Sequence, residues 1–424
     1  MTGPDPLPWG DADPAVRAAR AHAAQAASAV PAVPAVPAVP AVPVGEDGAV
    51  GAVGADERVA RAALTRLVEP GDAAFGRAVR AHGAARLLRD LCGPGPLPVE
   101  LARRDPAGYR VRLGGHDPRA DLARIAGLGG AFVVPGDPGW PSQLDDLGDA
   151  RPLGLWVRGA APLRLAALRS VAVVGARACT DYGAHVAATV AADLAEAGWT
   201  VVSGGAYGVD AAAHRGALVV AGRTVAVLAC GIDVNYPRGH ERLLARIAEE
   251  GTLVTELPPG AHPTRYRFVE RNRVIAALTR GTVVVEAALR SGALISARRA
   301  ARLGRRVMGV PGPIGSPSSA GVHALLREPG SVLVTRAAEV IEEVGLIGDD
   351  LAPVLSGPVR PGDDLAPETR RILETVPIHD TLSTALIARE AGVAPAATRR
   401  HLDVLVGREL VDRTSKGWRR RGGA

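Results

Sequence analysis

Three tripeptides combine glycine with serine or arginine directly after apolar runs that are typical of buried strands. They are Gly175-Ala176-Arg177, Ser203-Gly204-Gly205 and Arg290-Ser291-Gly292. Each lies before a segment with helical periodicity, so each marks a junction from strand to helix. At such a junction glycine lets a ligand approach the backbone, and the first N–H groups of the helix are free to bind an anion. The three tripeptides therefore predict contacts with phosphate.

The first of these turns differs from a dinucleotide-binding fingerprint. Residues 175–180 lack the second and third glycines of GxGxxG, and no acidic residue follows the second strand to hold a ribose hydroxyl. We therefore expect no NAD and no other cofactor. Arg177 instead offers a planar guanidinium that suits a phosphate. Taken alone, Arg177 fits an ion pair with a neighbouring acid equally well, and the second glycine turn favours phosphate.

Arginine is concentrated in residues 265–306, which hold eleven arginines against two glutamates, a net charge of +9. Tyr266 and Phe268 lie between the first of them. Single-stranded nucleic acid needs cations for its backbone and rings for its bases, with stacking worth ~1–3 kcal/mol per base. A solvated helix face is the alternative explanation for the arginines from 298 to 306. It fits Arg271-Asn272-Arg273 less well, because the sequence places this triplet where a helix begins.

No catalytic residue and no metal site is expected. A nucleophilic serine needs a base held by a third group, and residues 203–210 supply none for Ser203. Asp210 is expected to orient its helix and His214 to pack. The polar loop 233–237 fits a ligand-lining loop and a plain turn equally well. The three cysteines are odd in number and far apart, which fits a reducing cytoplasm.

Strand and helix patterns alternate through residues 169–345, and they must position the three tripeptides. The strands are expected at 171–174, 200–202, 224–229, 252–255, 282–286, 306–310 and 332–335. The helices are expected at 183–197, 209–220, 239–249, 272–278, 296–303 and 321–327. This alternation predicts an α/β fold with a doubly wound, Rossmann-like parallel sheet, whose carboxyl edge would hold all three turns.

The flanking segments predict further domains. Residues 1–55 are rich in Ala and Pro and predict a disordered tail, 56–127 a small helical domain, 128–345 the sheet domain and 346–368 a linker. Residues 369–424 show three short helices and a strand-turn-strand, the layout of a winged helix. Its third helix would present Thr398, Arg399, Arg400 and His401. Duplex binding and protein docking fit this domain about equally.

Charge and hydropathy narrow the class of protein. The chain has 424 residues and a net charge of +6, and only Lys416 among its 50 basic residues is lysine. The longest uncharged stretch, 23–45, has proline at every third position from 31 to 43, so no membrane-spanning helix is expected there. We expect a cytoplasmic protein that spans no membrane.

Seven stretches in order resemble one family, DNA processing protein A (DprA, also called Smf), across about residues 130–345. They are VAVVGARACTDYG, VVSGGAYGVDAAAH, TVAVLACGIDVNYP, GTLVTELPPG, RFVERNRVIAALT, VVVEAALRSGALISARRAARLGRRVMGVPGP and SSAGVHALL. The helical (SAM-like) N-terminal region and the winged helix are similar to the family's usual flanks. The chain departs from the family at Ala176, where serine is frequent, and at Glu270, which puts a carboxylate beside Arg271.

The resemblance implies a homodimeric, non-enzymatic mediator that binds single-stranded DNA, meets single-strand binding protein and loads the RecA recombinase during DNA uptake and natural transformation. It implies DNA contacts at the three tripeptides and at Arg271, Asn272 and Arg273. One alternative is a nucleotide phosphoribohydrolase on a related Rossmann core. That enzyme needs a glutamate beside a glycine loop, and this chain keeps Glu286 without the loop. A duplex-specific regulator that uses the winged helix is a third hypothesis.

Overall fold

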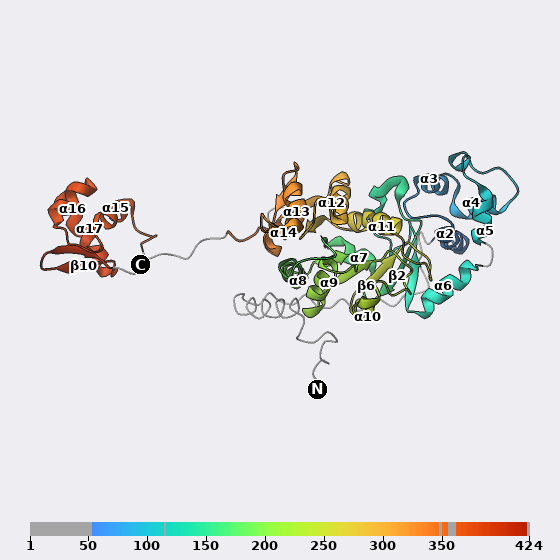
Figure 1. The fold of residues 1–424 in the computed structure, drawn as a ribbon, viewed down its shortest axis with the longest axis horizontal. Coiled ribbons are helices and arrows are strands. Elements are labelled where there is room, and N and C mark those ends of the chain that lie inside the picture. The colour runs from blue at the N-terminus through green and yellow to red at the C-terminus, as the bar shows by residue number, and fades with distance from the viewer. Residues whose placement is uncertain (1–52, 114–115, 347–349, 355–361, 422–424) are drawn as a thin grey trace, which may run out of the picture. The chain divides into compact units, whose positions relative to one another are not determined.

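The computed structural model describes residues 53–113, 116–346, 350–354 and 362–421 (Figure 1). The described residues form two compact units, with the boundary between Ala352 and Pro353. The predicted tail, 1–55, lies almost wholly outside the described residues, and so does part of the predicted linker, 346–368.

A nine-stranded sheet with the order β1-β2-β6-β5-β4-β3-β7-β8-β9 forms the centre of the first unit. The strands are β1 Gly130–Val133, β2 Leu155–Gly159, β3 Ser170–Val174, β4 Thr200–Ser203, β5 Thr224–Val227, β6 Thr252–Thr255, β7 Gly281–Val284, β8 Arg306–Gly309 and β9 Ser331–Leu333. Strands β3 to β9 pair in parallel, whereas β2 pairs antiparallel with both β6 and β1. The predicted α/β fold with a largely parallel, doubly wound sheet is confirmed.

Helices cover both faces of the sheet because its central strands are apolar on both sides. In β3, Val171 and Val173 belong to one core cluster, and Ala172 and Val174 belong to the other. The helices of this unit are α7 Leu163–Leu168, α8 Asp181–Glu196, α9 Val209–Val219, α10 Glu241–Glu250, α11 Arg265–Leu278, α12 Gly292–Arg302, α13 Pro317–Leu326 and α14 Ala337–Val344. Helices α8 and α9 pack on the first cluster, and α11 and α12 pack on the second.

The chain reverses its direction of travel through the sheet beside β3. It runs outward through β4, β5 and β6, returns along α11 to β7 on the other side of β3, and then continues to β8 and β9. The loops after β3 and β7 therefore leave in opposite directions. Doubly wound sheets bind ligands in the crevice that this reversal opens at the carboxyl ends of the strands.

Residues 55–127 form helices that pack against the sheet in the same unit. They are α2 Ala55–Leu67, α3 Ala73–His82, α4 Ala84–Cys92, the 3-10 turn Val99–Leu101, α5 Pro106–Leu113 and α6 Pro118–Gly127. Arg267 of α11 donates through both Nε and Nη2 to the Glu69 carboxylate at 2.8 Å. Arg66 of α2 donates to the Pro259 carbonyl at 3.1 Å. These helices thus contact the elements that surround the carboxyl edge of the sheet.

The second unit holds α15 Pro367–Thr375, α16 Thr384–Ala391, α17 Pro395–Gly407 and the hairpin β10 Val411–Thr414 and β11 Gly417–Arg420. Two of the four residues predicted to face a partner turn inward. Thr398 is buried and donates to the Ala394 carbonyl at 3.1 Å, and His401 lies 2.9 Å from the Thr369 hydroxyl. Arg399 lies over the Trp418 ring. Whether this unit binds a duplex or a protein stays a prediction.

No helix in the described ranges combines the length and the hydropathy needed to cross a bilayer.

Candidate nucleic-acid interface

The first turn is held in place by Glu286, which follows β7 and is almost fully buried. Its carboxylate accepts from the Thr180 amide at 2.8 Å and from the Thr180 hydroxyl at 2.6 Å. Its backbone carbonyl accepts from the Ala176 amide at 2.7 Å. A Cβ at Gly183 would collide with the same carboxylate, so glycine is required there. The Ala176 amide therefore has a partner within the chain and is not free for phosphate.

The second turn is organised around Asp210 at the start of α9. The Asp210 carboxylate accepts from the Gly204 amide at 3.1 Å and from the Ala206 amide at 3.4 Å. The Ser203 hydroxyl donates to the Val173 carbonyl at 2.7 Å, which ties β4 to β3. Asp210 thus orients its helix and turn, as expected. The free amides predicted for phosphate are not found at Gly204, because its N–H is already bonded.

Arg271 lies beneath this turn and is buried. Its Nη1 donates to the Gly204 carbonyl at 2.6 Å and also to the Val227 carbonyl, so it joins the ends of β4 and β5. A Cβ at Gly204 would overlap the guanidinium, which explains the glycine. Burial lowers the pKa of Arg271, and the nearby Asp210 opposes that shift. Burial likewise raises the pKa of Asp210, and Arg271 opposes it.

The triplet 271–273 does not begin a helix, and that expectation is wrong. Helix α11 begins at Arg265, where Thr264 caps it by accepting from the Arg267 amide at 3.3 Å. Successive helical residues point about 100° apart, so the triplet faces three directions. Arg273 is buried in an ion pair with Glu256, on the side of the N-terminal helices, and burial raises the pKa of Glu256.

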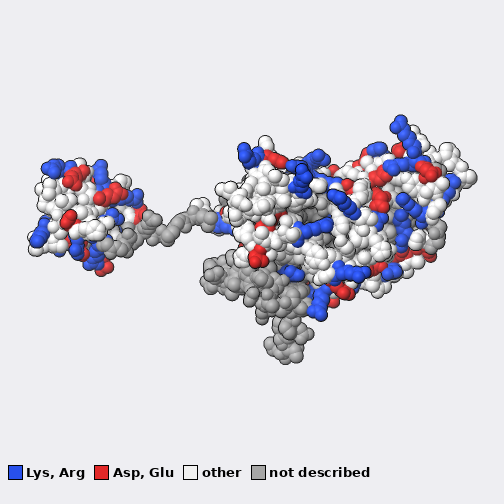
Figure 2. All heavy atoms as spheres, viewed as in Figure 1, with Lys and Arg blue, Asp and Glu red and all other residues white. Residues whose placement is uncertain are grey.

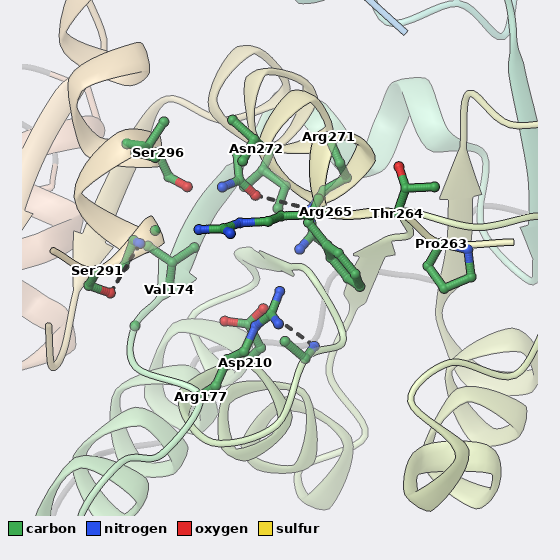
Figure 3. Close-up of a pocket in the computed structure, with 18 of the residues that line it drawn as sticks. Val174, Arg177, Asp210, Pro263, Thr264, Arg265, Arg271, Asn272, Ser291 and Ser296 are labelled. Atoms are coloured by element: carbon green, nitrogen blue, oxygen red, sulfur yellow. Dashed lines mark hydrogen bonds between the residues drawn. The ribbon is translucent and has the colours of Figure 1, made fainter. Parts of the chain in front are cut away.

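A cavity of about 730 Å³ opens above β3 and β7, between α11, α12 and the first turn. In Figure 3, Arg177 and Asp210 lie on one side, the α11 residues on the opposite side, and Ser291 and Ser296 on a third. The polar residues around it are Arg177, Asp210, Tyr236, Thr264, Arg265, Arg271, Asn272, Arg290, Ser291 and Ser296. Figure 2 shows basic side chains over the region where α11 and α12 lie in Figure 1.

The structure brings most of the predicted residues to this edge. Seven line the large cavity: Gly175, Arg177, Arg271, Asn272, Arg290, Ser291 and Gly292. Gly204 and Gly205 line a small adjoining cavity of about 30 Å³, which shares Arg177 with the large one. Ala176, Ser203 and Arg273 line neither cavity.

Two aromatic rings belong to the cavity wall, which the three tripeptides do not reveal. The Arg177 guanidinium lies 4.6 Å from the centroid of the Phe268 ring. The Phe268 and Tyr236 rings are 5.4 Å apart between centroids. Arg265 completes this side of the cavity. Arg265 and Phe268 belong to the arginine-rich segment 265–306, which the sequence indicates as a nucleic-acid contact. Tyr236 belongs to the polar loop 233–237, for which the sequence does not decide between a ligand-lining loop and a plain turn.

A doubly wound sheet with a basic cavity at its reversal point places the chain in the class of α/β proteins whose ligand sites lie at the carboxyl ends of the strands. The sequence model of DNA recombination-mediator protein A matches residues 131–345. The chain belongs to this family.

Individual relatives agree with this assignment. A putative DNA processing protein DprA of Mycobacterium tuberculosis is 43% identical over 373 residues, which is 85% of this chain and 93% of that protein. The DNA processing protein DprA of Streptococcus pneumoniae is 42% identical over 49% of this chain and 72% of that protein. The crystal structure of the Streptococcus pneumoniae protein superposes with a TM-score of 0.57 and 31% identity, covering 69% of this chain and 98% of that chain.

Proposed function

We propose that the chain binds single-stranded DNA in the cavity above β3 and β7. The observation that carries the proposal is a set of three cavity arginines, Arg177, Arg265 and Arg290, beside the Phe268 and Tyr236 rings. Guanidinium groups hold the phosphates, and a base that leaves the stack lies against a ring. Double-stranded DNA keeps its bases paired, so it cannot use the rings.

More than half of the eleven arginines in 265–306 form ion pairs within the chain. Six of them bind acids within the chain: Arg267, Arg273, Arg298, Arg299, Arg305 and Arg306. Among the described residues, Arg265 and Arg290 have no acidic partner, and neither has Arg177. Unpaired cations around a cavity favour an anionic ligand, whereas the charge of a paired arginine is already balanced by an acid of the chain.

The proposal extends to a role as a recombination mediator. In it, the chain acts in the cytoplasm as a homodimer, protects incoming single-stranded DNA alongside single-strand binding protein, and loads RecA during DNA uptake and natural transformation. Membership of a family described as recombination mediators supports this role. The tight ends of β3, β4 and β5 support it as well, because a preorganised site binds with less loss of conformational entropy.

The role is proposed to be non-enzymatic, and Glu286 argues against the phosphoribohydrolase alternative. A catalytic glutamate must reach the substrate, but this carboxylate is buried and bound to the Thr180 amide and hydroxyl. It does not line the cavity. Incubation with nucleoside monophosphates is expected to release no free base, and release of base would contradict the proposal.

The central test is the variant Arg177→Ala. We expect affinity for oligonucleotides of every sequence to fall about tenfold or more at low salt, and the slope of log affinity against log salt to become shallower by roughly one. The matched control is Arg223→Ala, which removes one exposed arginine just before β5, at the opposite edge of the sheet. Fluorescence anisotropy over a salt series measures both quantities.

Equal affinity and slope in Arg177→Ala and Arg223→Ala would contradict the proposed site. A gel-shift comparison of single- and double-stranded DNA, with and without RecA, tests the rest of the proposal. Tighter binding to the duplex would instead favour the second unit as the main DNA-binding part. Failure to speed RecA assembly on DNA coated with single-strand binding protein would contradict the loading role.

A further inference from the structure

Few aromatic rings are exposed among the described residues, and these rings gather at one edge of the sheet. In the described ranges, four aromatic side chains are more than a third exposed: Tyr182, Tyr207, Tyr236 and Tyr266. Each lies on the turn or helix that follows the carboxyl end of a parallel strand. Tyr236 lines the cavity, but Tyr266, the most exposed at 52%, does not.

Tyr266 instead lines a second hollow, which we name the α5 groove. This groove has a volume of about 810 Å³ and lies between α5, the end of α2 and the first turn of α11, where Arg103, Tyr109, Arg112 and Tyr266 line it. Pro263, Thr264 and Arg265 line the cavity and the next residue, Tyr266, lines the α5 groove, so adjacent residues at the start of α11 line the two hollows. The volume falls within the ~300–1,000 Å³ range of ligand pockets.

The acids of the α5 groove are hydrogen-bonded within the chain, whereas two of its arginines form no ion pair with any residue that the structure describes. Glu69 is bound by Arg267, and Asp72 caps α3 and accepts from Arg104 at 2.8 Å. Asp105 accepts from the Ala107 amide at 2.9 Å. Among the described residues Arg103 has no acidic partner, and Arg112 donates to the Leu67 carbonyl at 2.8 Å and forms no ion pair.

We propose that the α5 groove carries the continuation of the DNA strand beyond the cavity, with a base stacked on Tyr266 and phosphates held by Arg103 and Arg112. This inference rests on the proposed function. Continuity supports it: Arg265 faces the cavity and the next residue, Tyr266, faces the groove, so a strand that passes Arg265 meets the exposed ring. The N-terminal helices then form one wall of an extended DNA-binding site.

The test compares oligothymidylates of about 6 and about 12 nucleotides, lengths within the range that single-strand binding modules occupy. Tyr266→Ala is expected to weaken binding of the longer strand about tenfold and to leave the shorter strand unchanged, whereas Tyr266→Phe keeps wild-type affinity for both. Arg103→Ala is expected to make the salt slope shallower by roughly one for the longer strand only. Equal melting temperatures verify that the variants fold.

Each other outcome has a defined meaning. If Tyr266→Ala binds the longer strand with wild-type affinity, the proposal that DNA lies in the α5 groove is wrong. An equal loss of affinity for both strands would also contradict the proposal, because Tyr266 would then contribute to binding in the cavity and not in the α5 groove. Absence of binding of the shorter strand to the wild-type chain would instead contradict the proposed function, so the two failures are distinguishable.

Discussion

Arg177 and Arg271 are both predicted from the sequence to bind DNA, but they have different surroundings in the structure. Arg177 is at the cavity mouth, with its guanidinium over Phe268 and no acid bound to it among the described residues. Arg271 is buried and donates hydrogen bonds to the carbonyls of Gly204 and Val227. Arg177 therefore offers its charge to a ligand, and Arg271 fixes the shape of the turn beneath.

We therefore expect substitution of Arg271 to lower the stability of the chain, and substitution of Arg177 to lower its affinity for DNA. Arg271→Met removes a buried cation that donates to the Gly204 and Val227 carbonyls and that lies near the Asp210 carboxylate. We expect the free energy of unfolding to fall by about 2–4 kcal/mol, because two carbonyls lose a charged hydrogen-bond donor. Urea denaturation measures this loss, with Arg177→Met as the control of equal side-chain change. Wild-type stability with a shallower salt slope would show that Arg271 binds DNA directly.

At the scale of elements, α9 is fastened to β5 by a buried histidine. His214 of α9 lies 2.7 Å from the Thr224 hydroxyl through its Nδ1, and Thr224 donates to the Val201 carbonyl at 2.9 Å. Burial, with smaller contributions from His240, Arg271 and Arg215, lowers the pKa of His214 to about 3. His214 is therefore neutral in the folded chain, and because Thr224 donates its proton to Val201, its hydroxyl oxygen accepts from the Nδ1–H of His214.

The pH dependence follows from this lowered pKa. Below the ordinary pKa of 6.5 the unfolded chain binds a proton at His214 that the folded chain does not bind until about pH 3, so acid lowers stability across this window. Between pH 7 and pH 5 the wild type should lose about 2 kcal/mol more than His214→Gln, at ~1.4 kcal/mol per pH unit. Buried Asp210 has a raised pKa and the opposite sign, but it is common to both chains. Parallel curves would contradict this assignment.

The sheet was predictable, and the directions of the α11 side chains were not. Strand segments such as 171–174 are apolar at every residue, so they can be predicted even where the bounds of the intervening helices are wrong. The sequence predicts that this helix begins at residue 272, whereas α11 begins at Arg265, because the arginines and the tyrosine of the first turns show little apolar periodicity. Thr264 after proline was the capping signal that could have corrected it. Amides at Ala176 and Gly204 were expected to be free because sequence does not reveal long-range partners such as Glu286 and Asp210.

At the scale of the whole molecule, the cavity and the α5 groove belong to the first unit alone. A chain that ends at Ala352 is therefore expected to keep the melting transition of that unit and its affinity for the shorter oligothymidylate. Calorimetry and anisotropy measure the two quantities. Loss of affinity with an unchanged transition would show that residues 353–424 contribute to the DNA site, contrary to this prediction.

Every cation around the cavity is an arginine, and the single lysine, Lys416, lies in the turn between β10 and β11 of the second unit. Reagents that acylate amines therefore bypass the cavity and modify Lys416 and the α-amino group. A fluorophore or a sensor surface can be coupled through this lysine without altering any guanidinium of the first unit. Dicarbonyl reagents such as phenylglyoxal attack guanidinium groups instead, so DNA that occupies the cavity should shield Arg177, Arg265 and Arg290 from them.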